Sequence, residues 1–428
     1  MNSTSEQDLT PRSHEDYPLS AVPLAARRSI WSLAPLLIGF TLYSGSLFAG
    51  GRVGPAYRFF PDLVGLIVVG NLILGIYAGL LSYIAAKTGL NTVQMARFSF
   101  GSAGSRWVDF LLGFTQIGWY AWGSALIADL LNQLAGVPTS WNWLIILFFT
   151  YFFCSTAYMG YQAMDWLSRI AVPAMLILMF WSLAIASRDV GGFAGLQAIV
   201  PKQQLGLGEA ITIIVGTFVS GGTQATNWSR FAKDGRTAFI SSLSAFFLAN
   251  GLLVFSGAFC ALVYGEEDIV QVMAQQGLLF WGLMLLFLNM WTTQDNTIYA
   301  FSVAGAHMFR TNKRTAFVLG GATVALVLAW GGIYNLLVPY LILLGTFIPP
   351  IGGVVMADYW LRYKGEFPPL EQRQPALNWA GIIAYIIASA IAWIAPGIKP
   401  INGIVAAVIV YFVLSKLIAP TVKTKPVD

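Results

Sequence analysis

The amino-acid sequence predicts an all-α integral membrane protein with twelve transmembrane helices, and three observations support this fold class. The chain has 428 residues, of which 57% are hydrophobic and only 10% are charged. Soluble globular proteins are about 45–50% apolar and about 25% charged, so this composition excludes soluble, disordered and nucleic-acid-binding chains. Long windows without Asp, Glu, Lys or Arg recur along the chain, and basic residues gather in alternate loops between them. Both patterns are typical of proteins that cross a bilayer many times.

The individual spans follow from the length that a helix needs to cross a bilayer, about 20 apolar residues at about 1.5 Å per residue. The window 315–357 is long enough for two helices, and Gly331, Gly332 and Asn335 provide a break within it. The windows therefore predict twelve spans and place both termini on one side of the membrane. The windows without a charged residue are 29–51, 63–86, 110–128, 130–164, 170–187, 210–229, 237–265, 269–294, 315–357, 374–398 and 400–415.

The basic residues orient these spans. When loops are assigned alternately, 19 of the 24 basic residues fall on the side of the termini and 5 on the other. The positive-inside rule then predicts that both termini lie in the cytoplasm, with basic runs such as 310–314 acting as topology anchors. We expect the protein to lie in the inner membrane of the cell. The first 28 residues lack the apolar core of a secretory signal, so we expect this tail to stay attached. The five residues on the opposite side are Arg52, Arg58, Arg188, Lys202 and Lys399.

Short loops between twelve helices leave no room for a soluble catalytic or nucleotide-binding domain, and no P-loop is present. The two cysteines, Cys154 and Cys260, lie in apolar stretches, and two histidines cannot form a metal or catalytic centre. We therefore expect no enzymatic activity and no cofactor. A secondary transporter fits best, because a channel would show rings of charge or repeated filter loops. A channel and a non-transporting membrane sensor remain the alternatives of a different class.

Two segments carry glycine and hydroxyl residues at corresponding positions of two five-helix halves. They are residues 39–46 in the first span and residues 216–223 in the sixth. This pairing predicts that both helices are broken near the midplane, as in transporters built from inverted repeats, although small residues also allow close helix packing. The predicted organisation is a cytoplasmic tail at 1–28, repeats at 29–187 and 188–363, two further helices at 364–417 and a C-terminal cytoplasmic tail at 418–428.

The eighth span carries the most polar run of the predicted interior, from Asn289 to Asn296. At about 100° per residue, Asn289, Thr292, Thr293 and Asn296 share one face. Oxygen ligands without a full carboxylate suit a weakly held cation such as sodium, with the remaining ligands supplied by carbonyls freed where the first span unwinds. The alternative is hydrogen bonding between helices. Asp295 points about 120° away from Asn289 and is either a proton-coupling group or the partner of a cytoplasmic basic residue.

The third span places an amide and flat aromatic rings at helical spacing. Such residues can stack on a small planar molecule while the amide pairs with its polar edge, although aromatic residues also pack cores and membrane interfaces. No Arg, Lys or acid lies on the inward face, so a neutral ligand is favoured. The residues are Gln116, Trp119, Tyr120 and Gly123, facing Phe218 and Ser220 of the sixth span.

Several segments together resemble the nucleobase:cation symporter-1 family, and within it the bacterial cytosine permeases. The resemblance runs from about residue 20 to about residue 415. It implies a leucine-transporter-like fold of two inverted five-helix repeats, with helices 1 and 6 broken and two helices added, and nucleobase uptake coupled to sodium. The segments are 70–71 with 87–90, 96–101, 115–119, 289–296 and 349–353 with 357–359.

The resemblance also implies roles for particular residues. Trp119 and Phe218 would sandwich the base, while Gln116, Ser220 and Asn289 would make polar contacts with it. Sodium would be held by the carbonyls of Gly39, Leu42 and Asn289 and the hydroxyls of Thr292 and Thr293. Cytosine permeases have Asn where this chain has Gln294, and Ser where it has Thr217. Both positions are included in the predicted substrate site, and cytosine is the expected substrate, with another purine, hydroxymethylpyrimidine, hydantoin or allantoin as alternatives. We expect a monomer in the lipid bilayer.

Overall fold

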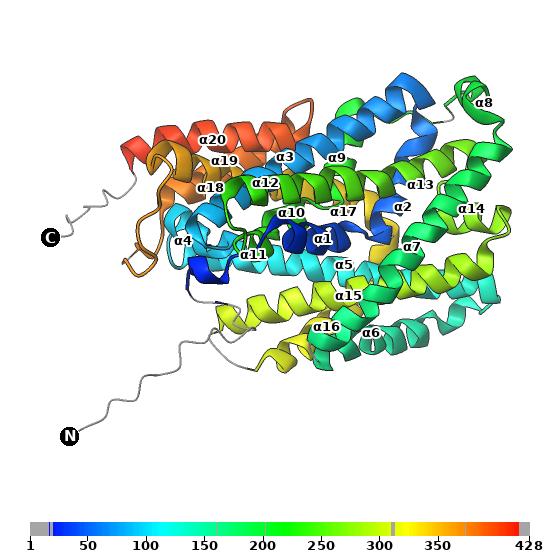
Figure 1. Ribbon diagram of the computed structural model, residues 1–428, viewed down its shortest axis with the longest axis horizontal. Coiled ribbons are helices and arrows are strands. Elements are labelled where there is room, and N and C mark those ends of the chain that lie inside the picture. The colour runs from blue at the N-terminus through cyan, green and yellow to red at the C-terminus, as the bar shows by residue number, and fades with distance from the viewer. Residues whose placement is uncertain are drawn as a thin grey trace.

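The computed structural model describes residue 17 and residues 20–159, 161–201, 203–309, 313–372 and 374–418. Its helices run mostly along one direction and form a single bundle (Figure 1). Within these residues there are helices, turns and one isolated bridge between Arg28 and Ala232, but no strand. The short helix η1 (Leu24–Ala26) and the end of α20 (Lys399–Leu417) lie at the same end of the bundle. The first and last helices of the described chain thus reach the same end of the bundle, as an even number of membrane crossings requires.

Each of the twelve predicted spans contains a helix. By length and composition, five helices of the described chain could cross a membrane, or seven if each bent pair counts as one. The count of twelve crossings and the repeat boundaries stay predictions. In chain order the span helices are α1 (Ile30–Thr41) with α2 (Ser44–Val53), α3 (Val64–Thr88), α5 (Gly104–Ala135), α6 (Asn142–Met159), α7 (Tyr161–Asp189), α9 (Leu207–Gly216) with α10 (Val219–Gln224) and α11 (Thr226–Ser229), α12 (Gly235–Leu243) with η5 (Ser244–Ala249) and α13 (Asn250–Tyr264), α15 (Leu279–Met308), α16 (Arg314–Trp330), α17 (Leu337–Phe347) with α18 (Pro349–Ala357) and η7 (Asp358–Arg362), α19 (Trp379–Ile394) and α20.

Shorter helices connect the spans at both ends of the bundle. Helix α3 ends at Gly89, whose φ of +74° is a left-handed conformation that favours glycine. Asn91 and Gln94 then form a capping box that starts α4, a helix that packs on α5, α18 and α19. The connecting helices are η2 (Gly54–Ala56), η3 (Phe59–Leu63), α4 (Thr92–Phe100), η4 (Thr139–Trp141), α8 (Gly192–Ala198), α14 (Ile269–Gln275) and η6 (Ile333–Leu336).

Helices α5 and α15 illustrate how the helix bounds differ from the charge-free windows. Helix α5 continues beyond its window through Asp109 and Asp129, because charged residues are tolerated where a helix nears the end of the bundle. The eighth window begins at residue 269, but Gly277, with φ of +70°, separates α14 from α15, which runs from Leu279 to Met308. The polar run from Asn289 to Asn296 therefore lies in the middle of α15 rather than at its end.

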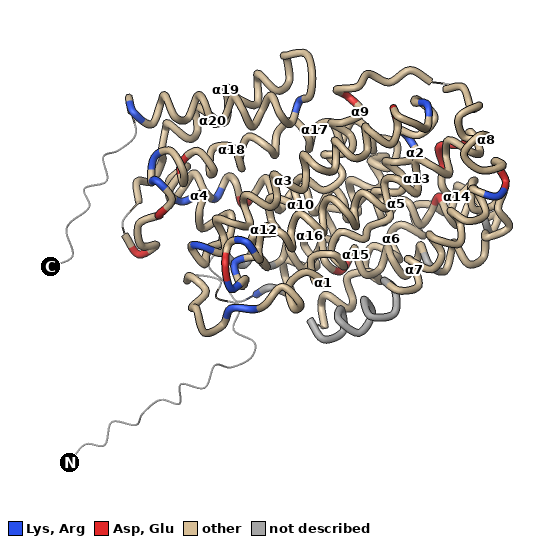
Figure 2. Tube along the Cα trace, turned by 45° about the horizontal axis from the view of Figure 1, so that its top comes forward, with Lys and Arg blue, Asp and Glu red and all other residues tan. Residues whose placement is uncertain are grey.

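The surface of the bundle is apolar between charged ends. Phe148 on α6, Ile394 on α19 and Leu417 on α20 are 59%, 79% and 72% exposed. Figure 2 shows Lys, Arg, Asp and Glu gathered toward the two ends, with few charges on the length of the helices between them. Soluble proteins rarely expose so much contiguous apolar surface, so the exterior fits the hydrocarbon core of a bilayer. The chain is a multi-pass membrane protein.

Candidate functional site

Both predicted helix breaks are present, and they define the centre of the candidate site. Helix α1 ends at Thr41, Leu42 and Tyr43 leave the helical conformation, and α2 continues at an angle of 56°. In the sixth span α9 ends at Gly216, and Phe218 adopts φ −138° and ψ 12° before α10 begins. Each break exposes backbone groups that a continuous helix would pair internally.

The side chain of Asn289 on α15 holds the first break in place. Its amide donates to the Leu42 carbonyl (2.9 Å) and accepts hydrogen bonds from the N–H (2.9 Å) and the hydroxyl (2.6 Å) of Ser44. All three residues are buried. Asn289 thus replaces the helical partners that the break removes. The sequence analysis singled out Asn289 but missed Ser44.

Three of the five predicted sodium ligands lie together on α15, and the Asn289 side chain joins this helix to the Leu42 carbonyl at the first break. The hydroxyls of Thr292 and Thr293 donate to the Asn289 carbonyl at 2.8 and 2.9 Å, and the Asn289 amide contacts the Leu42 carbonyl. Gly39 lies one turn earlier on α1, and its carbonyl accepts from the Leu42 N–H at 3.4 Å. Open space lies beside Gly39, where a Cβ would meet no atom within 4 Å. Carbonyl and hydroxyl oxygens are suitable ligands for a weakly held monovalent cation.

Aromatic rings surround the same region on the side of α5. Trp119 on α5 lies 5.3 Å from the ring of Tyr43, and Phe218 in the second break lies 6.2 Å from it. Trp119 also contacts Tyr340 at 5.3 Å. The structure therefore brings the two predicted stacking residues to one aromatic cluster. Tyr43 completes that cluster and was not predicted, although it is part of the motif that marked the first break.

The predicted polar contacts around these rings lack protein partners. Gln116 is 5% exposed and Ser220 is 1% exposed, and neither side chain makes a hydrogen bond to another residue in the described part of the chain. Buried polar groups are normally paired. Because the Gln116 amide and the Ser220 hydroxyl have no such partner among the described residues, both are available to a ligand.

Gln294 and Thr217, the two departures from the cytosine permease pattern, have protein partners. Gln294 donates to the Tyr120 carbonyl (2.5 Å) and the Ser124 hydroxyl (3.1 Å) of α5. Its Oε1 is buried without a partner in the described part of the chain, in space that Gly123 leaves open by lacking a Cβ. Thr217 donates to the Ile214 carbonyl at 2.6 Å. Its hydroxyl is therefore committed to the backbone of the second break.

A polar cluster missed by sequence reasoning ties the two breaks together. Asn250, at the start of α13, accepts from the Ser46 hydroxyl (2.6 Å) and donates to Asn71 (2.8 Å) and Thr217 (3.1 Å). All four residues are at most 1% exposed. Asn250 lies within a charge-free window without a neighbouring polar run, so nothing in the local sequence marks it.

Asp295 is fully buried and points away from Asn289, as the helical spacing predicts. It accepts hydrogen bonds from the Thr156 hydroxyl and from the Ala157 N–H (3.0 Å) of α6, and Trp291 donates to the same Thr156 hydroxyl at 3.0 Å. The alternative of a pairing with a cytoplasmic basic residue is not seen in the described part of the chain. The carboxyl lies too deep in the bundle, between α15 and α6.

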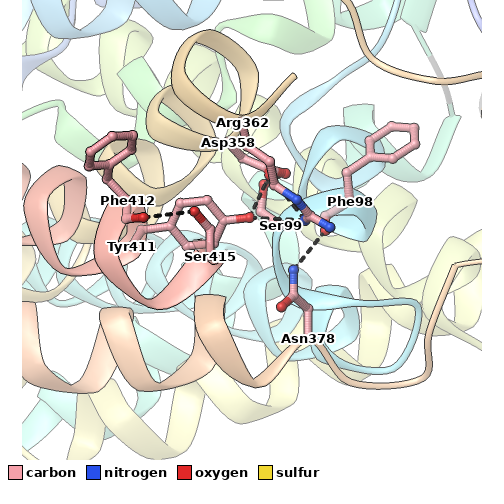
Figure 3. A network of polar contacts seen from close by, with 8 residues as sticks. All are labelled: Phe98, Ser99, Asp358, Arg362, Asn378, Tyr411, Phe412 and Ser415. Carbon is pink, nitrogen blue, oxygen red and sulfur yellow. Dashed lines mark hydrogen bonds and ion pairs between the residues drawn. The ribbon is translucent and has the colours of Figure 1, made fainter. Parts of the chain in front are cut away.

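A second buried acid, Asp358, lies where α18 passes into η7. It is 0% exposed, and it accepts from Ser99 (2.8 Å), Tyr411 (2.5 Å) and Arg362 (3.4 Å). Figure 3 shows how this carboxyl joins α4, η7 and α20. Its donors lie on α4, η7 and α20, and none of these helices carries a candidate site residue. Asp358 therefore stabilises the packing of these helices and is not part of the candidate site.

Comparison with known proteins agrees with this geometry. Residues 23–417 match the model of a family described as permease for cytosine/purines, uracil, thiamine, allantoin. The cytosine permease of Escherichia coli K12 is 36% identical over 397 residues, 93% of each chain. The inward-facing structure of Mhp1 superposes with a TM-score of 0.80 at 18% identity, covering 93% of this chain and 92% of that one.

A second structure of Mhp1, a nucleobase-cation-symport-1 family transporter in a closed conformation with bromovinylhydantoin bound, gives a TM-score of 0.76 at 19% identity. It covers 93% of this chain and 94% of that chain. The predicted resemblance and the fold with two broken helices are thereby confirmed. The chain belongs to the family of permeases for cytosine/purines, uracil, thiamine and allantoin.

Proposed function

We propose that this permease imports a neutral planar nucleobase, cytosine foremost, by symport with sodium across the inner membrane, with both termini in the cytoplasm. The observation that carries the proposal is the aromatic cluster of Trp119 and Phe218 beside two buried residues, Gln116 and Ser220, whose side chains make no hydrogen bond within the described part of the chain. Stacking suits a flat ring, and an amide can both donate to and accept from its edge. The relation to the Escherichia coli cytosine permease supports cytosine among the planar molecules.

Sodium is proposed as the coupling ion because the oxygens of Asn289, Thr292 and Thr293 lie together on α15 without a carboxylate. The Asn289 side chain links this group to the Leu42 carbonyl at the first break. The Leu42 carbonyl has two lone pairs, so it would bind the ion while keeping the Asn289 amide as a partner, and the two hydroxyls would rotate toward the ion. Alternating access would follow from one helix bundle moving against the rest around this fixed midplane site.

Two alternatives rest on specific observations. Gln294 carries one more methylene than the Asn of cytosine permeases, which favours a different planar molecule such as hydroxymethylpyrimidine, hydantoin or allantoin. Proton coupling would use Asp295, a buried carboxyl that accepts hydrogen bonds from neutral donors of α6 in the described part of the chain. A channel or a sensor is the alternative of a different class. Transport, rather than chemical conversion of the substrate, is the activity proposed for this chain.

Uptake into proteoliposomes tests the proposal. Labelled cytosine is supplied with and without an inward sodium gradient, with unlabelled adenine, uracil, hydroxymethylpyrimidine, hydantoin and allantoin as competitors. Sodium-stimulated accumulation of cytosine is expected. Uptake of a competitor in place of cytosine would shift the substrate, and uptake driven by a proton gradient alone would move coupling to Asp295. Flux that neither saturates nor accumulates would indicate a channel, and binding without flux a sensor.

A further inference from the structure

Tyr43 lies in the first break, next to both rings that are proposed to hold the substrate. Its ring centroid is 5.3 Å from that of Trp119 and 6.2 Å from that of Phe218. The ring planes are nearly perpendicular, at 85° and 88°. A flat molecule that stacks on Trp119 or Phe218 would therefore lie nearly perpendicular to the Tyr43 ring. Tyr43 forms a third side of the aromatic cluster.

The hydroxyl of Tyr43 is buried and has no hydrogen-bond partner among the residues that the structure describes. The whole residue is 3% exposed. Other buried tyrosines nearby are paired: Tyr120 donates to the Thr150 carbonyl (2.5 Å), and Tyr340 donates to the Thr115 carbonyl (2.6 Å). An unpaired buried hydroxyl destabilises a fold, so each one in a native structure requires an explanation. A group that a ligand satisfies is one such explanation.

The neighbouring backbone is adapted to this position of Tyr43. A Cβ on Gly45 would lie 2.5 Å from Cε1 of Tyr43 and 3.1 Å from Cζ3 of Trp119. Only glycine at position 45 therefore lets the tyrosine ring lie along the start of α2 and against the tryptophan. Gly45 thus allows the ring that carries the unpaired hydroxyl to pack closely at this position.

We propose that Tyr43 is a specificity-determining residue of the transport site, whose hydroxyl donates a hydrogen bond to a ring carbonyl oxygen of a neutral planar heterocycle stacked between Trp119 and Phe218. The proposal rests on the proposed function, because it requires a planar substrate in this cluster. It adds a chemical requirement that stacking cannot impose, since stacking accepts any flat ring. A ligand that lacks the bonded atom leaves the buried hydroxyl unpaired, so such a hydrogen bond discriminates strongly between otherwise similar ligands.

The test compares the wild type with Tyr43→Phe in detergent at saturating sodium, using three probes. Cytosine and pyrimidin-2-one carry the ring carbonyl, whereas 4-aminopyrimidine lacks it. For one hydrogen bond we expect Tyr43→Phe to raise Kd about tenfold for the two carbonyl compounds. The Kd of 4-aminopyrimidine is expected to stay within about twofold, because nothing faces the lost hydroxyl. An equal change for all three probes, or no change for any, would overturn the assignment.

Thermal unfolding separates this role from a structural one. Removing an unpaired hydroxyl should leave the unfolding temperature of the ligand-free protein unchanged or raise it, while the shift produced by cytosine shrinks. The matched control is Tyr77→Phe, because the Tyr77 hydroxyl is also buried but is paired with Thr223 at 2.7 Å. This control should lower the unfolding temperature and leave the ratio of the three affinities unchanged. A fall in unfolding temperature with Tyr43→Phe would contradict the proposal.

The proposed function and the assignment of Tyr43 are refuted by different results. A wild-type protein that binds none of the three probes would overturn the proposed function and this assignment with it. A wild-type protein that binds cytosine, beside a Tyr43→Phe variant with the same affinity profile, would overturn the assignment of Tyr43 alone.

Discussion

Replacing Asn289 with Ala removes the side chain that holds the first break, and the contacts give the size of the effect. Three buried hydrogen bonds are lost, one to the Leu42 carbonyl and two from Ser44. At about 1 kcal/mol each, the loss is about 3 kcal/mol, or roughly two orders of magnitude in an equilibrium constant. The Asn289 backbone carbonyl, a proposed sodium ligand, stays in the variant. The displaced group is the Leu42 carbonyl, so we expect ion binding to suffer more than substrate binding.

The assay measures cytosine binding to purified protein across a sodium titration. The sodium concentration for half-maximal binding should rise by roughly 10- to 100-fold, while the Kd of cytosine at saturating sodium should rise less than about threefold. Asn296→Ala is the control, because within the described residues the Asn296 amide donates to its own helix, to the Thr292 carbonyl at 3.1 Å. A large rise in cytosine Kd at saturating sodium, with an unchanged sodium requirement, would refute this reasoning and make the Asn289 side chain a substrate contact.

Three further predictions follow from the contacts described above. Thr293→Ala should raise the sodium concentration for half-maximal uptake by about tenfold, because one oxygen ligand is lost, and Thr293→Ser should restore it; normal uptake at low sodium in the alanine variant would contradict the ion site. Trp119→Ala should weaken cytosine binding by about 1–3 kcal/mol, measured by calorimetry against Trp141→Ala, whose ring is 54% exposed. Asp234 caps α12 by accepting from the Thr237 N–H, which holds the pKa of its carboxyl below the usual range. Asp234→Ala should therefore lower the free energy of unfolding by about 1 kcal/mol at neutral pH. This difference should disappear as the pH falls through the lowered pKa of the folded state. Unfolding curves measured at several pH values check both expectations.

Much of the fold could be predicted because a bilayer imposes simple rules on sequence. Charge-free length and the distribution of basic residues located a helix in every predicted span. The two breaks could be predicted as well, because glycine and hydroxyl residues interrupt an otherwise apolar helix at Gly39–Ser46 and again at Gly216–Thr223. The bounds were less accurate, since a window ends at the first charge while α5 and α15 continue past it.

The contacts within the site could be predicted only in part, because they join residues far apart in the chain. Asn289 and Ser44 are 245 residues apart, and their pairing depends on how α15 packs beside the first break. Helical spacing correctly grouped Asn289 with Thr292 and Thr293 and set Asp295 apart from them. It could not show that Asp295 would meet α6, since that depends on the rotation of one helix against another.

The first break is shared by the proposed ion and substrate sites, and this sharing bears on the mechanism. Leu42 and Tyr43 are adjacent: the Leu42 carbonyl faces Asn289, and the Tyr43 ring faces the aromatic cluster. One turn later, Ser46 reaches Asn250, which also donates to Thr217 in the second break. A ligand that fixes Tyr43 therefore restricts the carbonyl offered to the ion, and a bound ion restricts Tyr43 in return. Such reciprocity is what coupled transport requires, because each ligand must raise the affinity for the other by the same factor. A channel or a sensor has no need of that coupling, so the shared break favours symport over both.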